Sequence, residues 1–203
     1  MKSSLLKTIM LGITTLSITT LCATTSVESA EFSITTDGYI LMQGQIEYND
    51  DEKFKQFLLD NRGKGVKRVL LMNSGGGSVK AALKISRYVV SGRFHTGAIN
   101  QCASACTFIF FSSKGVRLNI DDAKIGVHSP YQIHGEKYVA SEKEGLLWWD
   151  VYGVWRSGGM SDENALNLLT LSYTIPPREM HYLDKNMLVK DYGVVYINTD
   201  SIE

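Results

Sequence analysis

Residues 68–78 read RVLLMNSGGGS, and this stretch indicates how the chain folds. Arg68–Met72 is a short, mostly apolar run of the kind that forms a buried strand. The three glycines that follow permit a sharp turn, because glycine adopts backbone conformations that other residues avoid. Ser78–Ser91 then repeats apolar residues at helical spacing. The sequence therefore predicts a strand, a tight loop and a helix in direct succession.

Strand and helix patterns alternate along the rest of the chain. Phe32–Thr36 and Tyr39–Gln43 flank Asp37-Gly38 and predict a hairpin. Thr107–Phe111 fits either a helix or a strand. Further strands are predicted at Phe94–Ile99, Lys124–Val127 and Val194–Ile197, and helices at Asp50–Asn61, Glu136–Arg156, Asp162–Ser172 and Met187–Tyr192. Helices placed between strands predict an α/β fold in one domain.

The composition excludes several classes of protein. The chain has 203 residues, with 21 Lys plus Arg balanced by 21 Asp plus Glu. A formal charge of zero argues against a protein that holds nucleic acid by bulk charge. Three cysteines are too few for a disulfide scaffold, and their spacing matches no zinc finger or ribbon. We therefore expect a globular protein with no metal site.

The N-terminal residues have the order of a secretory signal. A short lysine-containing segment is followed by an uncharged run over 8–23 and then by small polar residues. This order predicts a signal peptide over residues 1–30, cleaved between Ala23 and Ala30, and a mature domain over 31–203. The expected location is the periplasm or the exterior. An uncleaved segment that anchors the protein to a membrane is the alternative.

The glycine loop Asn73–Ser78 has the features of an anion site. Its glycines leave amide groups unshielded, and the free amides and positive end of a helix N-terminus face the same spot. It would suit a phosphate or the oxyanion of an acyl-transfer intermediate. Neither a Walker A motif nor G-x-G-x-x-G is present. A tight turn without a ligand is the alternative.

Ser104 and His128 are candidates for nucleophilic catalysis. Ser104 lies in Gln101–Thr107 (QCASACT), where small neighbours leave its hydroxyl approachable. A serine nucleophile needs a base, and His128 lies where a predicted strand ends at a turn. The alternatives are an ordinary helix N-cap for Ser104 and a structural role for His128.

Taken in order, three motifs resemble a known family: Asn-Ser-x-Gly-Gly-Ser, Ala-Ser-Ala, and Ile-Gly-x-His ending at His128. They are similar to the proteolytic subunit of Clp protease and the wider Clp/crotonase superfamily. Cys-Ala-Ser-Ala-Cys together with a leader resembles the secreted, periplasmic branch. The resemblance covers roughly Gly44 to Val195. It implies a single-domain spiral of strand–strand–helix units.

The resemblance also implies a role for each matching residue. Ser104 would be the nucleophile and His128 the general base of a serine peptidase. The backbone amide of Gly76 or Gly77, with that of Ala105, would form the oxyanion hole. The substrate would be a peptide or an unfolded protein, and no cofactor is implied. This chain carries no ATPase module, so hydrolysis would be independent of ATP.

The orienting acid is the weak point of the resemblance. The family places an aspartate shortly before a segment that here reads Asp191–Val194. No aspartate stands in register, and Glu179 or Asp184 would serve only if the loop shifts. A Ser–His dyad and a catalytically silent binding or scaffold protein therefore stay open. A crotonase-type acyl-CoA enzyme is a further alternative, disfavoured by the leader because CoA thioesters are cytoplasmic.

Two other features are left with alternatives. Cys102 and Cys106 stand four apart, which on a regular helix gives poor Cβ directions for a disulfide. We favour two buried thiols, and a disulfide that fixes the serine loop is the alternative. Trp148, Trp149 and Trp155 are expected either to pack in the core or to form an interface between subunits, because aromatic residues are enriched there. A homo-oligomer is therefore a hypothesis.

Overall fold

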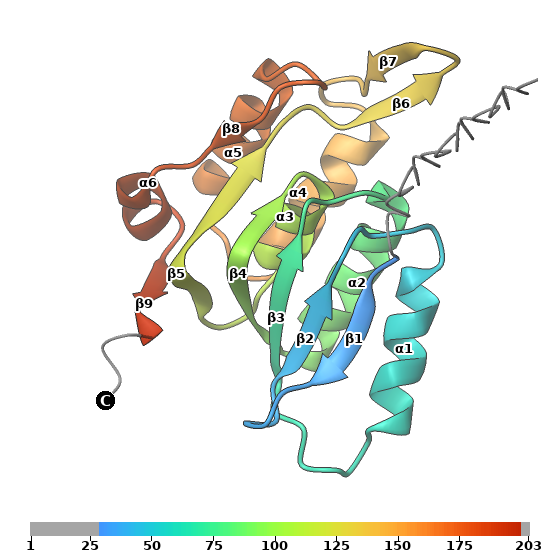
Figure 1. Cartoon of the computed structure of the whole chain (residues 1–203). Helices are drawn as coiled ribbons and strands as arrows, with labels where there is room; N and C mark the ends of the chain where they lie inside the picture. The colour runs from blue at the N-terminus through green and yellow to red at the C-terminus, as the bar shows by residue number, and fades with distance from the viewer. Residues whose placement is uncertain (1–28, 200–203) are drawn as a thin grey trace, which may run out of the picture.

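A computed structural model of the chain describes residues 29–199, and a seven-stranded sheet organises them (Figure 1). The strands follow the order β1-β2-β3-β4-β5-β8, and β9 also pairs with β5. The central strands are parallel, whereas β1 runs antiparallel to β2 and β8 runs antiparallel to β5. A second, two-stranded sheet joins β6 and β7.

The elements alternate as the sequence predicted. The strands are β1 (Glu31–Ile34), β2 (Ile40–Gln43), β3 (Val69–Ser74), β4 (His95–Ala103), β5 (Arg117–Val127), β6 (Tyr131–His134), β7 (Lys137–Ala140), β8 (His181–Tyr182) and β9 (Val194–Ile197). The helices are α1 (Asp50–Asp60), α2 (Val79–Gly92), α3 (Ala105–Phe110), α4 (Leu146–Ser157), α5 (Asp162–Thr174) and α6 (Lys185–Lys190). The prediction of a mixed α/β single domain is confirmed.

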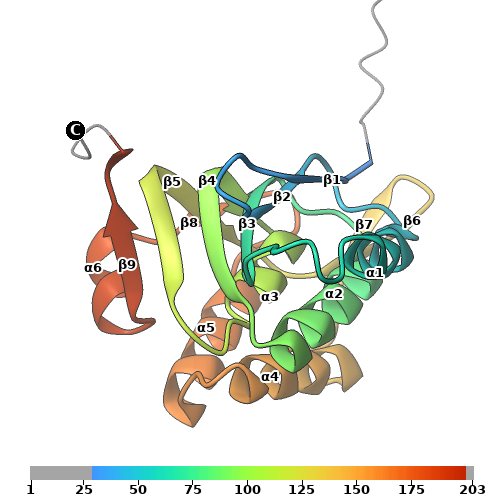
Figure 2. The same ribbon diagram turned by 90° about the horizontal axis from the view of Figure 1, so that it is seen from below.

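The core lies between the large sheet and the helices on one of its faces. Figure 2 shows α2, α3, α4 and α5 gathered on that face. The largest side chains that are fully buried there include Phe110, Phe111, Trp148 and Trp155. Trp149, by contrast, is 51% exposed. The core interpretation therefore holds for two of the three tryptophans, and an interface between subunits stays a prediction.

The parallel strands bring three loops to one edge of the sheet. The carboxyl ends of β3, β4 and β5 lie side by side, with Ser74 opposite Cys102 and Ala103 opposite Gly126. The segments that leave these ends are the glycine loop, the turn at Ser104 and the turn at His128. Residues distant in sequence therefore meet, because parallel strands point their ends in the same direction.

The predicted helix Glu136–Arg156 is wrong in its first half. Residues 131–140 form the β6–β7 hairpin, and α4 begins only at Leu146. Gly135, with φ of 61°, allows the chain to reverse, and the aromatic and β-branched residues on either side favour strands. The strand predicted at Lys124–Val127 also extends back to Arg117, and β8 was not predicted.

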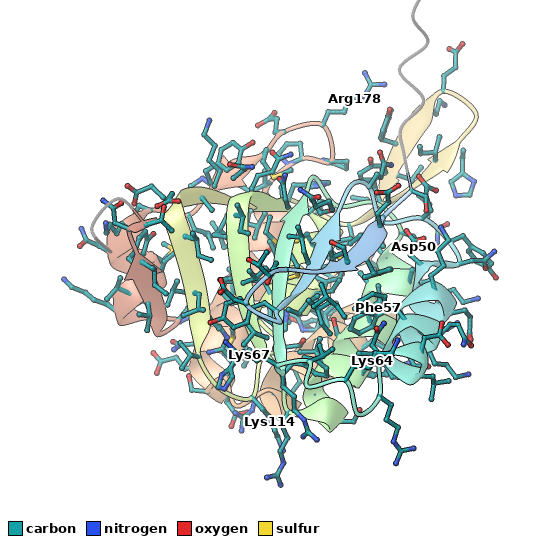
Figure 3. All side chains as sticks on the ribbon, turned by 60° about the horizontal axis from the view of Figure 1, so that its bottom comes forward. Asp50, Phe57, Lys64, Lys67, Lys114 and Arg178 are labelled. Atoms are coloured by element: carbon teal, nitrogen blue, oxygen red, sulfur yellow. A yellow bond between two sulfur atoms is a disulfide. The ribbon has the colours of Figure 1, made fainter. Side chains whose placement is uncertain are left out.

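The first described residues are part of the fold. Ser29 pairs with Gln45, and Ala30 is 3% exposed in the core. Asp50 is buried and accepts hydrogen bonds from the Ser29 hydroxyl, the Ala30 amide and the Glu47 amide. Figure 3 labels Asp50 where α1 approaches β1. Ser29 and Ala30, which we expected to belong to the leader, therefore contact the domain.

The predicted signal peptide otherwise lies outside the described residues. Its cleavage, the periplasmic location and the alternative of a membrane anchor stay predictions. Within residues 29–199, none of the helices has the length and apolar character needed to cross a bilayer.

Candidate active site

Ser104 and His128 are in direct contact. The Nε2 atom of His128 lies 2.7 Å from the Oγ atom of Ser104. The hydroxyl can donate to this nitrogen when the ring carries its hydrogen on Nδ1. A nucleophile and a base within this distance have the geometry needed for proton transfer.

The backbone at Ser104 is strained. Its φ of 54° and ψ of −129° lie in a region that side-chain-bearing residues rarely adopt, at a cost of about 1–3 kcal/mol. Ser104 occupies the N-cap position of α3, yet its side chain makes no capping hydrogen bond. The Ser104 amide donates to the Gly126 carbonyl, and the Thr107 amide donates to the Ser104 carbonyl. The backbone conformation therefore directs the Ser104 hydroxyl away from α3 and toward His128.

Gly76 packs against this turn. A Cβ atom on Gly76 would lie 2.7 Å from the Ala103 carbonyl oxygen, 2.7 Å from the Ser104 Cβ and 3.0 Å from the Ala105 amide nitrogen. Gly76 also has φ of 104°, in the region that favours glycine. Only a glycine lets the loop after β3 approach the serine turn so closely.

The candidate amides of an oxyanion hole differ in their hydrogen bonds. The Gly76 amide donates to the Ser74 hydroxyl at 3.2 Å and is therefore engaged. Gly77 forms a parallel bridge with Ile46, in which the bonds are made by its neighbours: the Gly76 carbonyl accepts from Ile46 and the Ser78 amide donates to Ile46. The bridge therefore does not engage the Gly77 amide, and Gly77 is exposed in the lining of the cleft. Ala105 supplies the first amide of α3.

His128 is buried, and no side chain or backbone group of residues 29–199 forms a hydrogen bond with its second ring nitrogen, Nδ1. The residue is 8% exposed, and the Nδ1 atom is itself buried. Burial lowers the pKa of His128 from its ordinary value of 6.5, and the Ser129 backbone opposes part of that shift. The ring packs beside Tyr131, with ring centres 5.6 Å apart. A neutral imidazole at neutral pH is the form that can accept a proton.

Neither predicted acid contacts His128. Asp184 caps α6, where its carboxylate accepts from the Met187 amide at 2.9 Å. The Leu183 amide donates to the carbonyl of Ile125, which stands three residues before His128 on β5. Asp184 follows Leu183 and therefore lies further along β5, away from His128. Glu179 lines the same cleft as His128 but makes no hydrogen bond or ion pair with it among the described residues. The orienting acid is therefore not provided by either side chain in this structure.

Ser104 and His128 open into a cleft of about 1010 Å³. The glycine loop and Gln45–Tyr48 line one part of it, and Pro130, Tyr131 and Ile133 line another. Arg178, labelled in Figure 3, also belongs to this lining. No strand or helix was predicted at Tyr131 and Ile133, so these cleft residues of the hairpin were missed. The alternating pattern around Gly135 is the signal that would have revealed them.

Cys102 and Cys106 form a disulfide, so the expectation of two buried thiols is wrong. The expectation assumed one regular helix, whereas Cys102 lies at the end of β4 and Cys106 in the first turn of α3. The turn at Ser104 separates them and leaves their Cα atoms 5.3 Å apart, within the range of disulfides. Among residues 29–199, no group of three or more His, Cys, Asp or Glu side chains is arranged to hold a metal ion.

A sequence model of one family, described as Clp protease, matches residues 26–143. This match covers more than half of the chain. The chain belongs to the Clp protease family. A search of curated protein sequences finds no match.

Two solved structures have a fold similar to that of this chain. One is a serine-to-alanine mutant of the 1510-N membrane-bound stomatin-specific protease, with a TM-score of 0.59 and 13% identity over 80% of this chain and 78% of that chain. Another is a lysine-to-alanine mutant of the same protease in complex with a substrate peptide, with a TM-score of 0.59 and 14% identity over 80% and 74%. At such identities the likeness shows a Clp-protease-like fold.

Proposed function

We propose that the chain is a serine peptidase in which Ser104 is the nucleophile and His128 is the general base. The observation that carries the proposal is the 2.7 Å contact between Ser104 Oγ and His128 Nε2 in an open cleft. The strained Ser104 backbone adds support, because such conformations concentrate at functional sites. Membership of the Clp protease family supports peptide bonds as the substrate.

The reaction follows from the contacts. Oγ of Ser104 attacks the carbonyl carbon of a peptide bond while Nε2 of His128 takes the hydroxyl proton. The amides of Gly77 and Ala105 stabilise the oxyanion of the tetrahedral intermediate. The imidazolium then gives its proton to the leaving amine, and the acyl group stays on Ser104. Water, activated by His128, hydrolyses this acyl-enzyme.

The site acts as a Ser–His dyad. Because Nδ1 of His128 has no carboxylate partner in the described part of the chain, packing in the buried pocket and beside Tyr131 holds the ring. Of the two amides first considered beside Ala105, Gly77 is preferred because the Gly76 amide is engaged. Substrates would be short peptides or unfolded segments that thread the cleft without ATP-driven unfolding.

A fluorophosphonate probe tests the proposal directly. Purified protein without the leader should form a covalent adduct that peptide mapping by mass spectrometry assigns to Ser104. Ser104→Ala should abolish the adduct, and His128→Ala should slow its formation by about 10²–10⁴-fold. Ser91→Ala is the matched control, because Ser91 is exposed at the end of α2 and bonds the Tyr88 carbonyl. An adduct on another serine, or equal rates for wild type and His128→Ala, would refute the dyad.

One observation favours a second function. A histidine without an orienting acid also suits a binding or scaffold protein that keeps the cleft and has lost catalysis. In that case the folded wild type would stay unlabelled, while extended peptides would still bind the cleft. Peptide binding measured by fluorescence anisotropy, together with the probe, separates the two functions.

A further inference from the structure

The disulfide brackets the reactive serine. Cys102 and Cys106 stand two residues before and two residues after Ser104. Their bond therefore closes a small ring around the turn that links β4 to α3. No step of the proposed reaction uses either sulfur, so the bond requires its own explanation.

Both ends of the disulfide are held rigidly. Cys102 pairs with Ser74 on β3 and with Ile125 on β5, so it is fixed at the carboxyl end of a strand that has neighbours on both sides. Cys106 is fully buried, and its sulfur lies 4.0 Å from the sulfur of Met72. The bond consequently ties the first turn of α3 to the carboxyl end of β4.

Ser104 needs such a restraint. The positive φ of Ser104 is unfavourable for a residue with a side chain. If Cys102 and Cys106 could move apart, the turn between them could adopt other conformations. A return to negative φ would change the direction in which the chain leaves β4. Cys106 would then move relative to Cys102, which the covalent bond resists. The same movement would displace the Ser104 hydroxyl from His128 and the Ala105 amide from Gly76.

We infer that the Cys102–Cys106 disulfide is a positioning element for the nucleophile, holding Ser104 in its strained conformation against His128. This inference rests on the proposed function of Ser104. The cysteines act through the turn and do not contact the reacting atoms.

The burial of the bond indicates a permanent brace. Both cysteine side chains have 0% exposure. A reductant in solution would reach the sulfurs only after the domain opens, since thiol–disulfide exchange needs direct access. The native protein should therefore keep the bond in millimolar dithiothreitol, and mass spectrometry after acid quenching and alkylation should detect no modified Cys102 or Cys106.

The main test removes the bond in Cys102→Ala/Cys106→Ala. We expect the maximal rate of fluorophosphonate labelling at Ser104 to fall about 10- to 100-fold, with little change in the probe concentration at half saturation. Phe54→Leu is the stability control. Phe54 is buried on α1 beside Phe32 and Phe94, away from the serine turn, so this variant should lose stability and keep its labelling rate.

A second form of the protein avoids substitutions. Wild type is unfolded in denaturant with dithiothreitol, which is oxidised to its cyclic disulfide as the cystine gains two protons and two electrons. The reduced chain is refolded without oxygen and compared with the oxidised chain. Slow labelling of the reduced chain, with recovery after oxidised glutathione restores the bond, supports the brace. Failure of both this form and the double variant to fold would overturn it, because the bond would then stabilise the whole domain.

Crystal structures separate this inference from the proposed function. In the double variant, Ser104 should adopt negative φ and lose its contact with His128. If wild type is not labelled, the peptidase proposal fails, yet the structures still test the brace. Equal labelling rates with an unchanged Ser104 backbone in the variant would overturn the brace and leave the peptidase proposal standing.

Discussion

Gly76 lies so close to Ser104 that a Cβ on the glycine would fall 2.7 Å from the Cβ of the serine. The two residues belong to different loops, one after β3 and the other after β4. Their contact sets the spacing between the glycine-loop amides and the serine hydroxyl. A side chain at residue 76 would therefore disturb the geometry on which the proposed reaction depends.

Gly76→Ala should impair both stability and labelling. The new methyl group would meet the Ala103 backbone at a position with positive φ, so we expect a loss of about 1–3 kcal/mol in the free energy of unfolding. The labelling rate at Ser104 should fall by at least about 10-fold, because displaced groups lose the attack geometry. Denaturant unfolding and probe kinetics measure the two effects.

Gly153→Ala is the control for that substitution. Gly153 lies in α4, and a Cβ there would meet no atom within 4 Å. Alanine should stabilise this helix by about 0.5–1 kcal/mol without altering labelling. If Gly76→Ala left the labelling rate and the stability as high as this control does, the close approach of Gly76 to Ser104 would not be needed for the reaction.

The labelling rate should depend on the protonation of His128. Burial lowers the pKa of this imidazole from 6.5, so the ring stays neutral at pH 7 and accepts the Ser104 proton. The rate should be level near neutral pH and should fall as the pH drops through a midpoint below 6.5. Probe kinetics between pH 4.5 and 8, over the range in which circular dichroism shows the native fold, would locate it. A midpoint above 6.5 would contradict a buried base without a carboxylate partner.

Asp50→Asn should destabilise the domain. The buried carboxylate accepts hydrogen bonds from Ser29, Ala30 and Glu47, and it pairs with Lys53 at 2.8 Å. An amide cannot accept all of these, so we expect a loss of about 2–4 kcal/mol in the free energy of unfolding. Asp60 is exposed, and its carboxylate accepts a hydrogen bond from the Gln56 amide, so Asp60→Asn should change the free energy of unfolding by less than about 0.5 kcal/mol.

The effect of Asp50 on stability should also depend on pH. Burial raises the pKa of this carboxyl, but the hydrogen bonds led by Lys53 outweigh burial and leave the pKa below 3.8. A carboxyl with a lowered pKa in the folded state stabilises it above the unfolded pKa and loses that contribution as pH falls. The difference between wild type and Asp50→Asn should therefore be constant at neutral pH and shrink below about pH 4. A difference that grows on acidification would refute this assignment.

Asp184→Ala should affect stability and leave labelling intact. Asp184 caps α6 through the Met187 amide, and loss of such a cap costs about 1 kcal/mol. Because Asp184 does not contact His128, the probe should still react with Ser104 at the wild-type rate. A fall of more than about 10-fold in a folded variant would show that Asp184 serves as the orienting acid after all.

Local patterns were sufficient for most of the fold. Helices α1, α2 and α5 were predicted within two residues of their ends, because each repeats apolar residues at helical spacing behind polar or capping residues. The β6–β7 hairpin was missed because its second strand was predicted as the beginning of a helix that in fact starts at Leu146. Strand β8 has two residues and is defined by its pairing with β5, which no local pattern contains.

The sequence alone determined the order of strand, glycine loop and helix, and it singled out Ser104 and His128 as candidate residues. These features depend on residue type and on neighbours along the chain. Only the tertiary structure decided that the two side chains touch, that the cysteines pair across the serine turn, and that Glu179 and Asp184 do not contact the imidazole. The physical reason is that parallel strands bring their carboxyl ends together, and the resulting contacts depend on register and turn geometry rather than on sequence spacing.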